Sequence, residues 1–217
     1  MKDNPTFTVY TGPMFGSKTS KLLSTLEKYK YQHKKIIVFK PLIDDRYGVS
    51  EVVTHGGWRY PATCVKTGQE ILGHLIDMND EPHVVAVDEA FMIPGVAQAL
   101  VCLYKLGFTI VVSSLDMSSA GKPFKEIEEM LVWATHVEKC TAVCTVCGRD
   151  AHYTHKKQTG GDEIEVGGEE LYEPRCYSHH LSIDNRPKTK DNLYVATQTK
   201  LARNLDDNCA CCLRKIL

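Results

Sequence analysis

The chemistry nearest the N-terminus is that of a phosphate-binding loop, and it is carried by the run Gly12-Pro13-Met14-Phe15-Gly16-Ser17-Lys18-Thr19. A β-like segment precedes this run and a helix-like segment follows it. That order lets backbone N–H groups and a helix N-terminus converge on phosphate oxygens. Lys18 is then expected to reach the β- and γ-phosphates of a nucleoside triphosphate, and the Thr19 hydroxyl to hold Mg²⁺. The usual pattern has glycine directly before the lysine, whereas this chain has Ser17 there and Gly16 one position early. Taken alone, the run also fits a glycine turn that opens an ordinary helix.

A second signal is a pair of acids, Asp88 and Glu89, directly after the apolar segment 84–87. The carboxyl end of such a strand lies beside the first loop of a parallel sheet, so Asp88 is expected to hold Mg²⁺ directly or through water. Glu89 is expected to point into the crevice, where a general base is needed. Two solvated carboxylates at a strand end are the alternative, which the phosphate-binding loop in the same chain disfavours.

A third signal is a pair of metal-ligand motifs, Cys144-x-x-Cys147 and Cys176-x-x-His179. Tetrahedral zinc takes four such ligands, and four protein ligands leave no position for a reactive water. The sequence therefore predicts a structural zinc that stabilises a segment too small to form a core of its own. Buried free thiols beside a surface histidine are the alternative. Other histidines near enough to compete for the fourth position are His152, His155 and His180.

The elements that must position these residues alternate along the first two-thirds of the chain. Strands are expected at 6–10, 35–40, 83–88 and 109–115, and helices at 18–33, 68–79, 96–106 and 124–134. Two of the strands are apolar without alternation, as parallel strands buried on both faces are. In the last helix, Ile127, Met130 and Leu131 have the spacing of a buried stripe. The pattern predicts an α/β fold, with an open, mostly parallel sheet and helices on both sides.

The composition changes near residue 140, which suggests three parts: a nucleotide-binding domain at 1–139, a zinc-binding lasso domain at 140–182 and a polar tail at 183–217. Glycine pairs at 160–161 and 167–168 bracket a short run that we interpret as a loop. Three thiols crowd the tail but give only a weak metal signal: Cys209, Cys211 and Cys212.

Charge and hydropathy exclude several classes of partner. The chain has 217 residues and a formal net charge of −1, which gives no electrostatic reason to expect nucleic acid. No apolar run reaches membrane-spanning length, and residues 1–5 lack the apolar core of a signal peptide. We therefore expect a cytoplasmic protein with neither a nucleic-acid nor a membrane partner.

Together these motifs resemble the type II thymidine kinases over roughly residues 6–182. The matching segments are 12–15, 44–47 with 54–55, 88–90, 115–116 with 122–124, 141–144, 151–154, 166–168, Tyr172 and Cys176. The resemblance implies that ATP and Mg²⁺ are used to phosphorylate the 5′-hydroxyl of thymidine, with deoxyuridine as a possible acceptor. It also implies a homotetramer and feedback inhibition by dTTP.

The resemblance further implies a role for individual residues. Glu89 would be the general base, and Arg46 would steady charge on the transferring phosphoryl group. The expected donor and metal contacts are Gly12, Pro13, Met14, Phe15, Gly16, Ser17, Lys18, Thr19, Asp44, Asp88 and Phe91. The expected nucleoside contacts are Met92, Leu115, Ser119, Phe124, Thr154, Glu163, Ile164, Glu165, Val166, Gly167 and Tyr172. The lasso would bind the pyrimidine mainly through backbone groups, which explains its glycines.

This chain departs from the family pattern near the donor and acceptor sites. Ser17 can form the phosphate nest only if its φ and ψ suit a non-glycine residue. Phe91 and Met92 stand where glutamine and phenylalanine are usual, and Ser119 where the vertebrate enzyme often has an aromatic residue. Two other functions stay open on these grounds: a nucleotide-binding protein with impaired kinase activity, and a zinc-ribbon module that binds nucleic acid or protein.

Overall fold

A six-stranded, fully parallel sheet forms the centre of the computed structural model, which describes residues 4–44, 50–54, 56–76, 78, 82–158 and 164–180. The strand order is β5-β2-β6-β7-β1-β8. The strands are β1 (Phe7–Thr11), β2 (Ile36–Pro41), β5 (Thr63–Val65), β6 (Val84–Val87), β7 (Thr109–Ser114) and β8 (His136–Lys139). The predicted open parallel sheet is confirmed.

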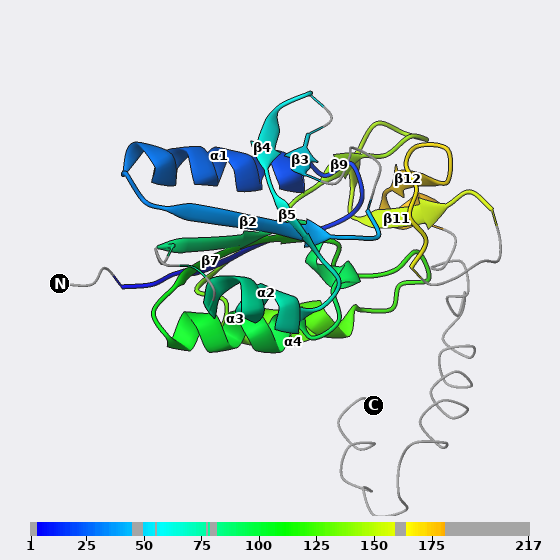
Figure 1. Cartoon of the computed structure of the whole chain (residues 1–217). Helices are drawn as coiled ribbons and strands as arrows, with labels where there is room; N and C mark the ends of the chain where they lie inside the picture. The colour runs from blue at the N-terminus through cyan, green and yellow to red at the C-terminus, as the bar shows by residue number, and fades with distance from the viewer. Residues whose placement is uncertain are drawn as a thin grey trace, which may run out of the picture. The chain divides into compact units, whose positions relative to one another are not determined.

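Helices cover both faces of this sheet (Figure 1). Helix α1 (Lys18–Tyr31) lies on one face, and the other carries α2 (Gly68–Ile76), α3 (Val96–Lys105) and α4 (Lys125–Trp133). Each face has its own core because successive side chains of a strand point in opposite directions. In β6, Val84 and Ala86 pack with the α1 side, whereas Val85 and Val87 pack with the α2–α4 side. This two-sided burial explains why the strand is apolar at every position.

Most predicted elements are found within a few residues of their expected bounds, but one predicted buried residue is exposed and several short strands were not predicted. Leu131 is 37% exposed, while Ile127 and Met130 are buried as expected. Neither edge strand was predicted, since β5 has only three residues and most residues of β8 are exposed with little apolar pattern. Two short strands, β3 (Glu51–Val53) and β4 (Arg59–Pro61), form a hairpin that the sequence did not indicate. The expected end of the second helix, near residue 79, lies outside the described residues.

The chain after β8 forms two small antiparallel pairs and a short 3₁₀ helix. The pairs are β9 (Ala142–Val143) with β10 (Asp150–Ala151), and β11 (Tyr153–Lys156) with β12 (Tyr172–Arg175). The 3₁₀ helix η2 (Tyr177–His179) follows β12. The chain up to His180 packs as one compact unit, so a separate domain beginning at residue 140 stays a prediction. The predicted tail, 183–217, lies outside the described residues.

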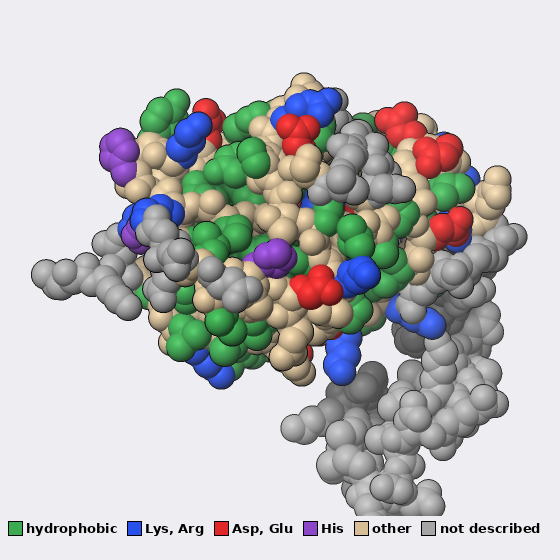
Figure 2. All heavy atoms as spheres, viewed as in Figure 1, with side chains coloured by type: hydrophobic (Ala, Val, Ile, Leu, Met, Phe, Trp, Pro, Cys, Tyr) green, Lys and Arg blue, Asp and Glu red, His purple; other side chains and the backbone are tan. Residues whose placement is uncertain are grey.

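The described surface is mixed in charge. On the face drawn in Figure 2, acidic and basic side chains lie among one another. None of the described helices combines the length and apolar character needed to cross a bilayer.

Candidate active site

The turn that leaves β1 requires glycine at its first position. Gly12 has φ +132°, and a Cβ built there would lie 2.3 Å from the carbonyl oxygen of Cys140. The crowding arises because the chain after β8 is bonded to the end of β1, with the Cys140 N–H donating to the Thr11 carbonyl at 2.7 Å. No side chain fits in this position without moving the backbone.

The next residues of the loop alternate in backbone handedness. Phe15 and Ser17 have φ 63° and 57°, in the left-handed region, whereas no left-handed φ is recorded at Gly16 between them. Alternation of this kind turns successive N–H groups toward one side and makes an anion-binding nest. The glycine thus stands where its conformational freedom is not needed, and the serine stands where glycine would be favoured. Gly16 is still confined, because a Cβ there would lie 3.1 Å from the Pro13 carbonyl oxygen.

We predict that Ser17→Gly raises the free energy of unfolding by about 0.5–1 kcal/mol. A non-glycine residue in the left-handed region costs about 1–2 kcal/mol, and the greater freedom of glycine in the unfolded chain offsets part of the gain. Ser24→Gly is the matched control, because Ser24 is exposed in the middle of α1 and should lose about 0.5 kcal/mol instead. Chemical denaturation measures both. A Ser17→Gly protein less stable than the parent would show that this backbone conformation is not strained.

Lys18 begins α1 and is buried in the floor of the loop. Its ammonium group donates to the Pro13 carbonyl at 2.5 Å. Burial lowers the pKa of Lys18, and the nearby charges of Glu89 and Asp88 oppose that shift. A bound phosphate would supply the negative charge that this ammonium group needs.

Asp88 lies at the carboxyl end of β6, directly beside the start of α1. Its Oδ1 accepts hydrogen bonds from the Thr19 hydroxyl at 3.1 Å and from the Ser113 hydroxyl. Burial raises the pKa of Asp88 to about 7, with the charge of Glu89 contributing in the same direction. A hydroxyl and a carboxylate side by side, with excess negative charge, fit a divalent cation such as Mg²⁺.

We predict a pH dependence of Mg²⁺–ATP binding from this carboxylate. The Asp88 pKa is raised to about 7. Below that pH the ionised fraction of Asp88 falls about tenfold per pH unit, and well above it the carboxylate is almost fully ionised. Affinity should therefore weaken as the pH falls from about 7 to about 5.5 and stay level above about 8. Calorimetric titrations of the wild type and of Asp88→Asn test this, since the difference between the two profiles removes the protonation of ATP itself. Parallel profiles for the two proteins would contradict the prediction.

Glu89 lies between two adjoining cavities. The first cavity is lined by the phosphate loop and Asp88, and the second by Thr154 and Phe124. Glu89 and Met14 line both. Glu89 has φ 50° and precedes the short 3₁₀ helix η1 (Ala90–Met92). A non-glycine residue held in this region costs about 1–3 kcal/mol, so the surrounding fold must maintain it. Glu89 is thereby held in the wall that the two cavities share.

The first cavity also contains residues that the sequence did not single out. Lys40 lies near the carboxyl end of β2 and is 3% exposed, and it lines this cavity together with the expected Asp44. A charged residue at the carboxyl end of a buried parallel strand was the available signal. The remaining unexpected members are Ser20, Val52, Val53 and Thr54.

The second cavity gathers most of the expected nucleoside contacts. Those on its wall are Met92, Leu115, Ser119, Phe124, Thr154, Ile164, Glu165 and Tyr172. Phe91, expected near the donor, lies here instead, with its ring centroid 4.6 Å from that of Phe124. Met117 and Ser118 line the cavity without having been predicted. Neither Val166 nor Gly167 is among its lining residues, and Arg46 and Glu163 lie outside the described residues.

Within the lasso domain, Ile164 and Glu165 line this cavity, and two contacts hold Glu165 in place. The Lys156 ammonium group on β11 forms an ion pair with Glu165, and the Tyr172 hydroxyl donates to the Glu165 carbonyl at 3.0 Å. The side chain of Lys156 is only 13% exposed, so solvent screens the pair less than a surface pair. Glu165 is thereby tied to both strands of the β11–β12 pair.

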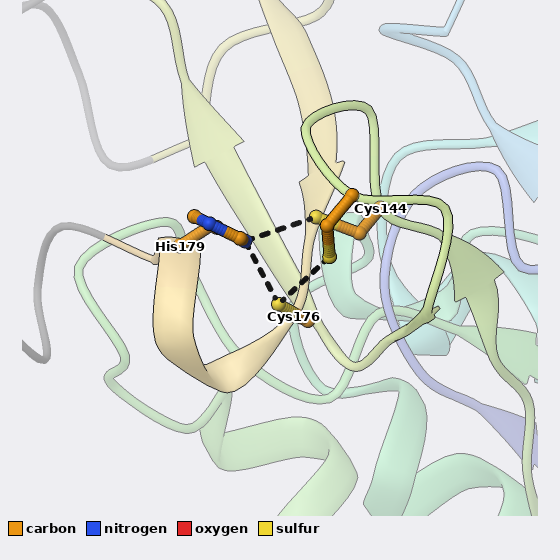
Figure 3. A group of neighbouring side chains, drawn as sticks. Cys144, Cys176 and His179 are labelled. Carbon is orange, nitrogen blue, oxygen red and sulfur yellow. Dashed lines mark hydrogen bonds between the residues drawn. The ribbon is translucent and has the colours of Figure 1, made fainter.

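The four predicted metal ligands converge on one point. Possible ligand atoms of Cys144, Cys147, Cys176 and His179 all lie within 4.8 Å of one another. Figure 3 shows the His179 ring facing two of the thiols, with Nδ1 3.8 Å from Cys144 Sγ and 3.2 Å from Cys176 Sγ. Burial raises the pKa of the Cys144 thiol, but backbone hydrogen bonds outweigh this effect and bring it to about 6. Three thiols and one imidazole in this arrangement fit a tetrahedral structural zinc.

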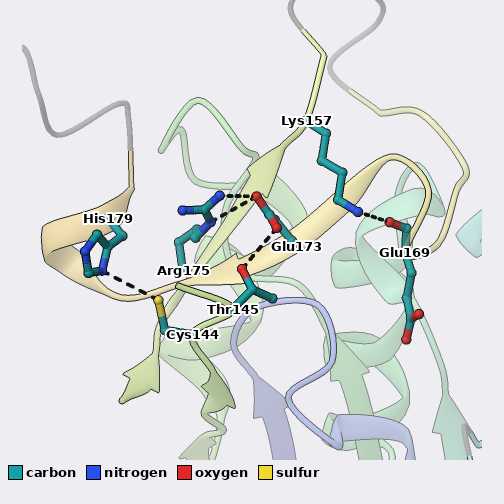
Figure 4. A network of polar contacts seen from close by, with 7 residues as sticks. All are labelled: Cys144, Thr145, Lys157, Glu169, Glu173, Arg175 and His179. Carbon is teal, nitrogen blue, oxygen red and sulfur yellow. Dashed lines mark hydrogen bonds and ion pairs between the residues drawn. The ribbon is translucent and has the colours of Figure 1, made fainter. Parts of the chain in front are cut away.

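The strands around the cluster are tied together by polar contacts (Figure 4). Glu173 on β12 accepts from the Thr145 hydroxyl at 3.0 Å and pairs with Arg175. Lys157 donates to the Glu169 carbonyl across the loop that follows β11. The Thr145–Glu173 bond connects the Cys144 turn to β12. The same strand carries Tyr172 of the second cavity, so the cluster and this cavity both depend on β12.

Comparison with known proteins agrees with this geometry. A family model described as thymidine kinase matches residues 6–180. A thymidine kinase of Thermococcus kodakarensis is 38% identical over 185 residues, which cover 81% of this chain and 94% of the relative. A thymidine kinase of Ureaplasma parvum serovar 3 is 32% identical over 191 residues, which cover 84% of this chain and 85% of the relative.

Proposed function

Because the chain belongs to the thymidine kinase family, we propose that it transfers the γ-phosphoryl group of ATP to the 5′-hydroxyl of thymidine. One observation carries the proposal: Glu89 lies on the wall of both cavities, where a donor phosphate and an acceptor hydroxyl would meet. In-line phosphoryl transfer needs the two substrates to approach from opposite sides of the transferred group. Two cavities that share the Glu89 side of their walls support such an approach of donor and acceptor.

The donor side supplies groups that bind charge. The loop N–H groups and the Lys18 ammonium would bind the phosphates. Thr19 and Asp88 would hold Mg²⁺, which neutralises charge on the phosphate oxygens when bound. Lys18 would exchange its present bond to the Pro13 carbonyl for one to phosphate. Arg46 is a further proposed donor contact, by family resemblance.

On the acceptor side, Glu89 would take the proton from the 5′-hydroxyl as that oxygen attacks phosphorus. The Phe91–Phe124 ring pair offers an apolar wall for the base or deoxyribose. Thr154 and the backbone of Ile164 and Glu165 offer polar contacts around it. We propose thymidine as the main acceptor and deoxyuridine as a second one, since the two differ by one methyl group, which is worth about 1 kcal/mol in an apolar pocket.

A coupled phosphorylation assay tests the function directly. Purified, zinc-loaded protein is supplied with ATP, Mg²⁺ and one of thymidine, deoxyuridine or deoxycytidine. We expect the fastest turnover with thymidine. Absence of turnover with all three nucleosides would overturn the proposal.

The left-handed Ser17 supports a second candidate, a nucleotide-binding protein with impaired catalysis. Calorimetric titration separates the two functions. Normal binding of nucleoside or dTTP without turnover supports the second candidate, and exchanging Gly16-Ser17 for Ser-Gly should then restore activity.

Family membership also suggests properties beyond the single chain. We propose a cytoplasmic homotetramer that dTTP inhibits. Sedimentation of the full chain tests the assembly, and an inhibition series with dTTP tests the feedback.

A further inference from the structure

His180 follows the metal ligand His179 but faces a different part of the molecule. Its side chain is 2% exposed, and its Nε2 lies 3.0 Å from the backbone carbonyl oxygen of Thr154. A carbonyl oxygen can only accept a hydrogen bond, so Nε2 carries the proton in this contact. The ring also packs against Tyr153, with centroids 4.9 Å apart. His180 is therefore committed to β11 rather than to the zinc cluster.

The Thr154 carbonyl needs this partner because of its place in the sheet. Thr154 is 3% exposed and lies opposite Pro174 in the β11–β12 pair. The Lys157 N–H donates to the Leu171 carbonyl, so by the alternation of an antiparallel pair Thr154 and Pro174 are not hydrogen-bonded to each other, and the Thr154 carbonyl points away from β12. A buried carbonyl without a donor costs about 1–3 kcal/mol. The imidazole of His180 supplies a donor on the side of β11 that faces away from β12.

The side chain of the same threonine reaches the phosphate loop. The Thr154 hydroxyl accepts from the Met14 N–H at 3.0 Å. Met14 lines both cavities, so its backbone position affects the donor and the acceptor side together. Thr154 thus has one polar group bonded to His180 and another bonded to the loop.

We propose that His180 is a positioning residue that acts through Thr154 to set the distance between the nucleoside cavity and the phosphate loop. The inference rests on the proposed kinase function for its kinetic readout. His180 lines neither cavity but is bonded to Thr154, which lines the second one, so we expect its effect to pass through β11. The neighbouring His179 lies in one cluster with the cysteines. The backbone that carries the His180 ring is therefore anchored at this cluster.

The test combines two replacements of His180 with one of Thr154. His180→Phe keeps an aromatic ring but removes the donor, whereas His180→Gln keeps an N–H donor near the position of Nε2. We expect the KM for thymidine to rise about tenfold in His180→Phe, at unchanged zinc content, and to return to within about threefold of the wild type in His180→Gln. His136→Phe, at an exposed position on β8, is the matched control and should change nothing.

The double variant His180→Phe/Thr154→Val tests the route. If His180 acts through the Thr154 hydroxyl, the double variant has the KM of Thr154→Val alone, because the pair is not additive. Independent, multiplying effects would overturn the proposal. So would a His180→Phe protein with lowered stability but unchanged KM, which is the behaviour of an ordinary core residue.

A readout that needs no activity separates this inference from the proposed function. With ¹⁵N-methionine, the five methionine amides that follow Met1 can be followed individually by NMR. The Met14 amide should exchange with solvent at least about tenfold faster in His180→Phe than in the wild type, and the Gln variant should restore protection. Unchanged Met14 exchange in a folded His180→Phe protein would refute the proposal. Absence of thymidine turnover in the wild type would refute only the kinase function.

Discussion

Glu89→Gln is expected to lower kcat for thymidine phosphorylation by a factor of about 10²–10⁴, the usual contribution of a general base. The amide has nearly the same shape as the carboxylate but cannot accept the proton of the 5′-hydroxyl. Glutamine and glutamate also carry a similar cost at φ 50°, so the comparison isolates the charge and basicity of the group. Initial-rate kinetics with thymidine measure the effect, and calorimetry with ATP should show that donor binding is kept.

Glu128→Gln is the matched control for this prediction, because it makes the same chemical change at an exposed position of α4. It should leave kcat and the KM for thymidine unchanged. A Glu89→Gln enzyme with kcat within about threefold of the wild type would mean that another group accepts the proton. The assignment of the base would then be wrong, even though the cavities still meet at this residue.

Cys176→Ser is expected to abolish zinc binding and to lower kcat/KM for thymidine by more than about 100-fold. That exceeds the 10–100-fold loss typical when only a partner behind a metal ligand is changed. The apolar cluster around the site contains only Ala142, Cys144, Ala151 and Cys176, with Phe15 of the phosphate loop packed against it. So small a core cannot hold β11 and β12 in place without the metal. Thr154 and Tyr172 would then leave the wall of the second cavity.

Cys102→Ser is the control, since Cys102 is an exposed free thiol on α3 outside the ligand cluster. Zinc content by mass spectrometry, thymidine kinetics and limited proteolysis are compared for the three proteins. We expect new cleavage sites after β8 in Cys176→Ser only. Full activity in a zinc-free Cys176→Ser protein would show that the strands do not depend on the metal.

The four inner strands of the sheet were predictable because they carry strong local signals. Strands buried on both faces must be apolar at every position. The apolar segment 84–87 therefore indicated both a strand and its burial on both faces of the sheet. The exposed edge strand β8 has no such constraint and was missed. The exposure of Leu131 has the same origin, since helical spacing shows which residues share a stripe but not how wide the buried part is.

The candidate site divides along similar lines. The cluster of four candidate metal ligands was predictable because each pair needs only a short turn to bring its members together. The position of Phe91 was not, since no local pattern shows which of two adjoining cavities a side chain enters. His180 was interpreted as a possible ligand because it adjoins His179, but the turn of η2 directs it to Thr154 instead.

The sequence by itself therefore determined most of the elements, the candidate phosphate-binding loop, the acidic strand end and the candidate metal ligands, because each depends on residues close together in the chain. Only the tertiary structure decided how they act together. It brought Thr19 to Asp88, placed Glu89 where two cavities meet and joined Met14 to Thr154. It also set the handedness of Ser17. These relations depend on the packing of distant segments against one another, which spacing along the chain does not encode.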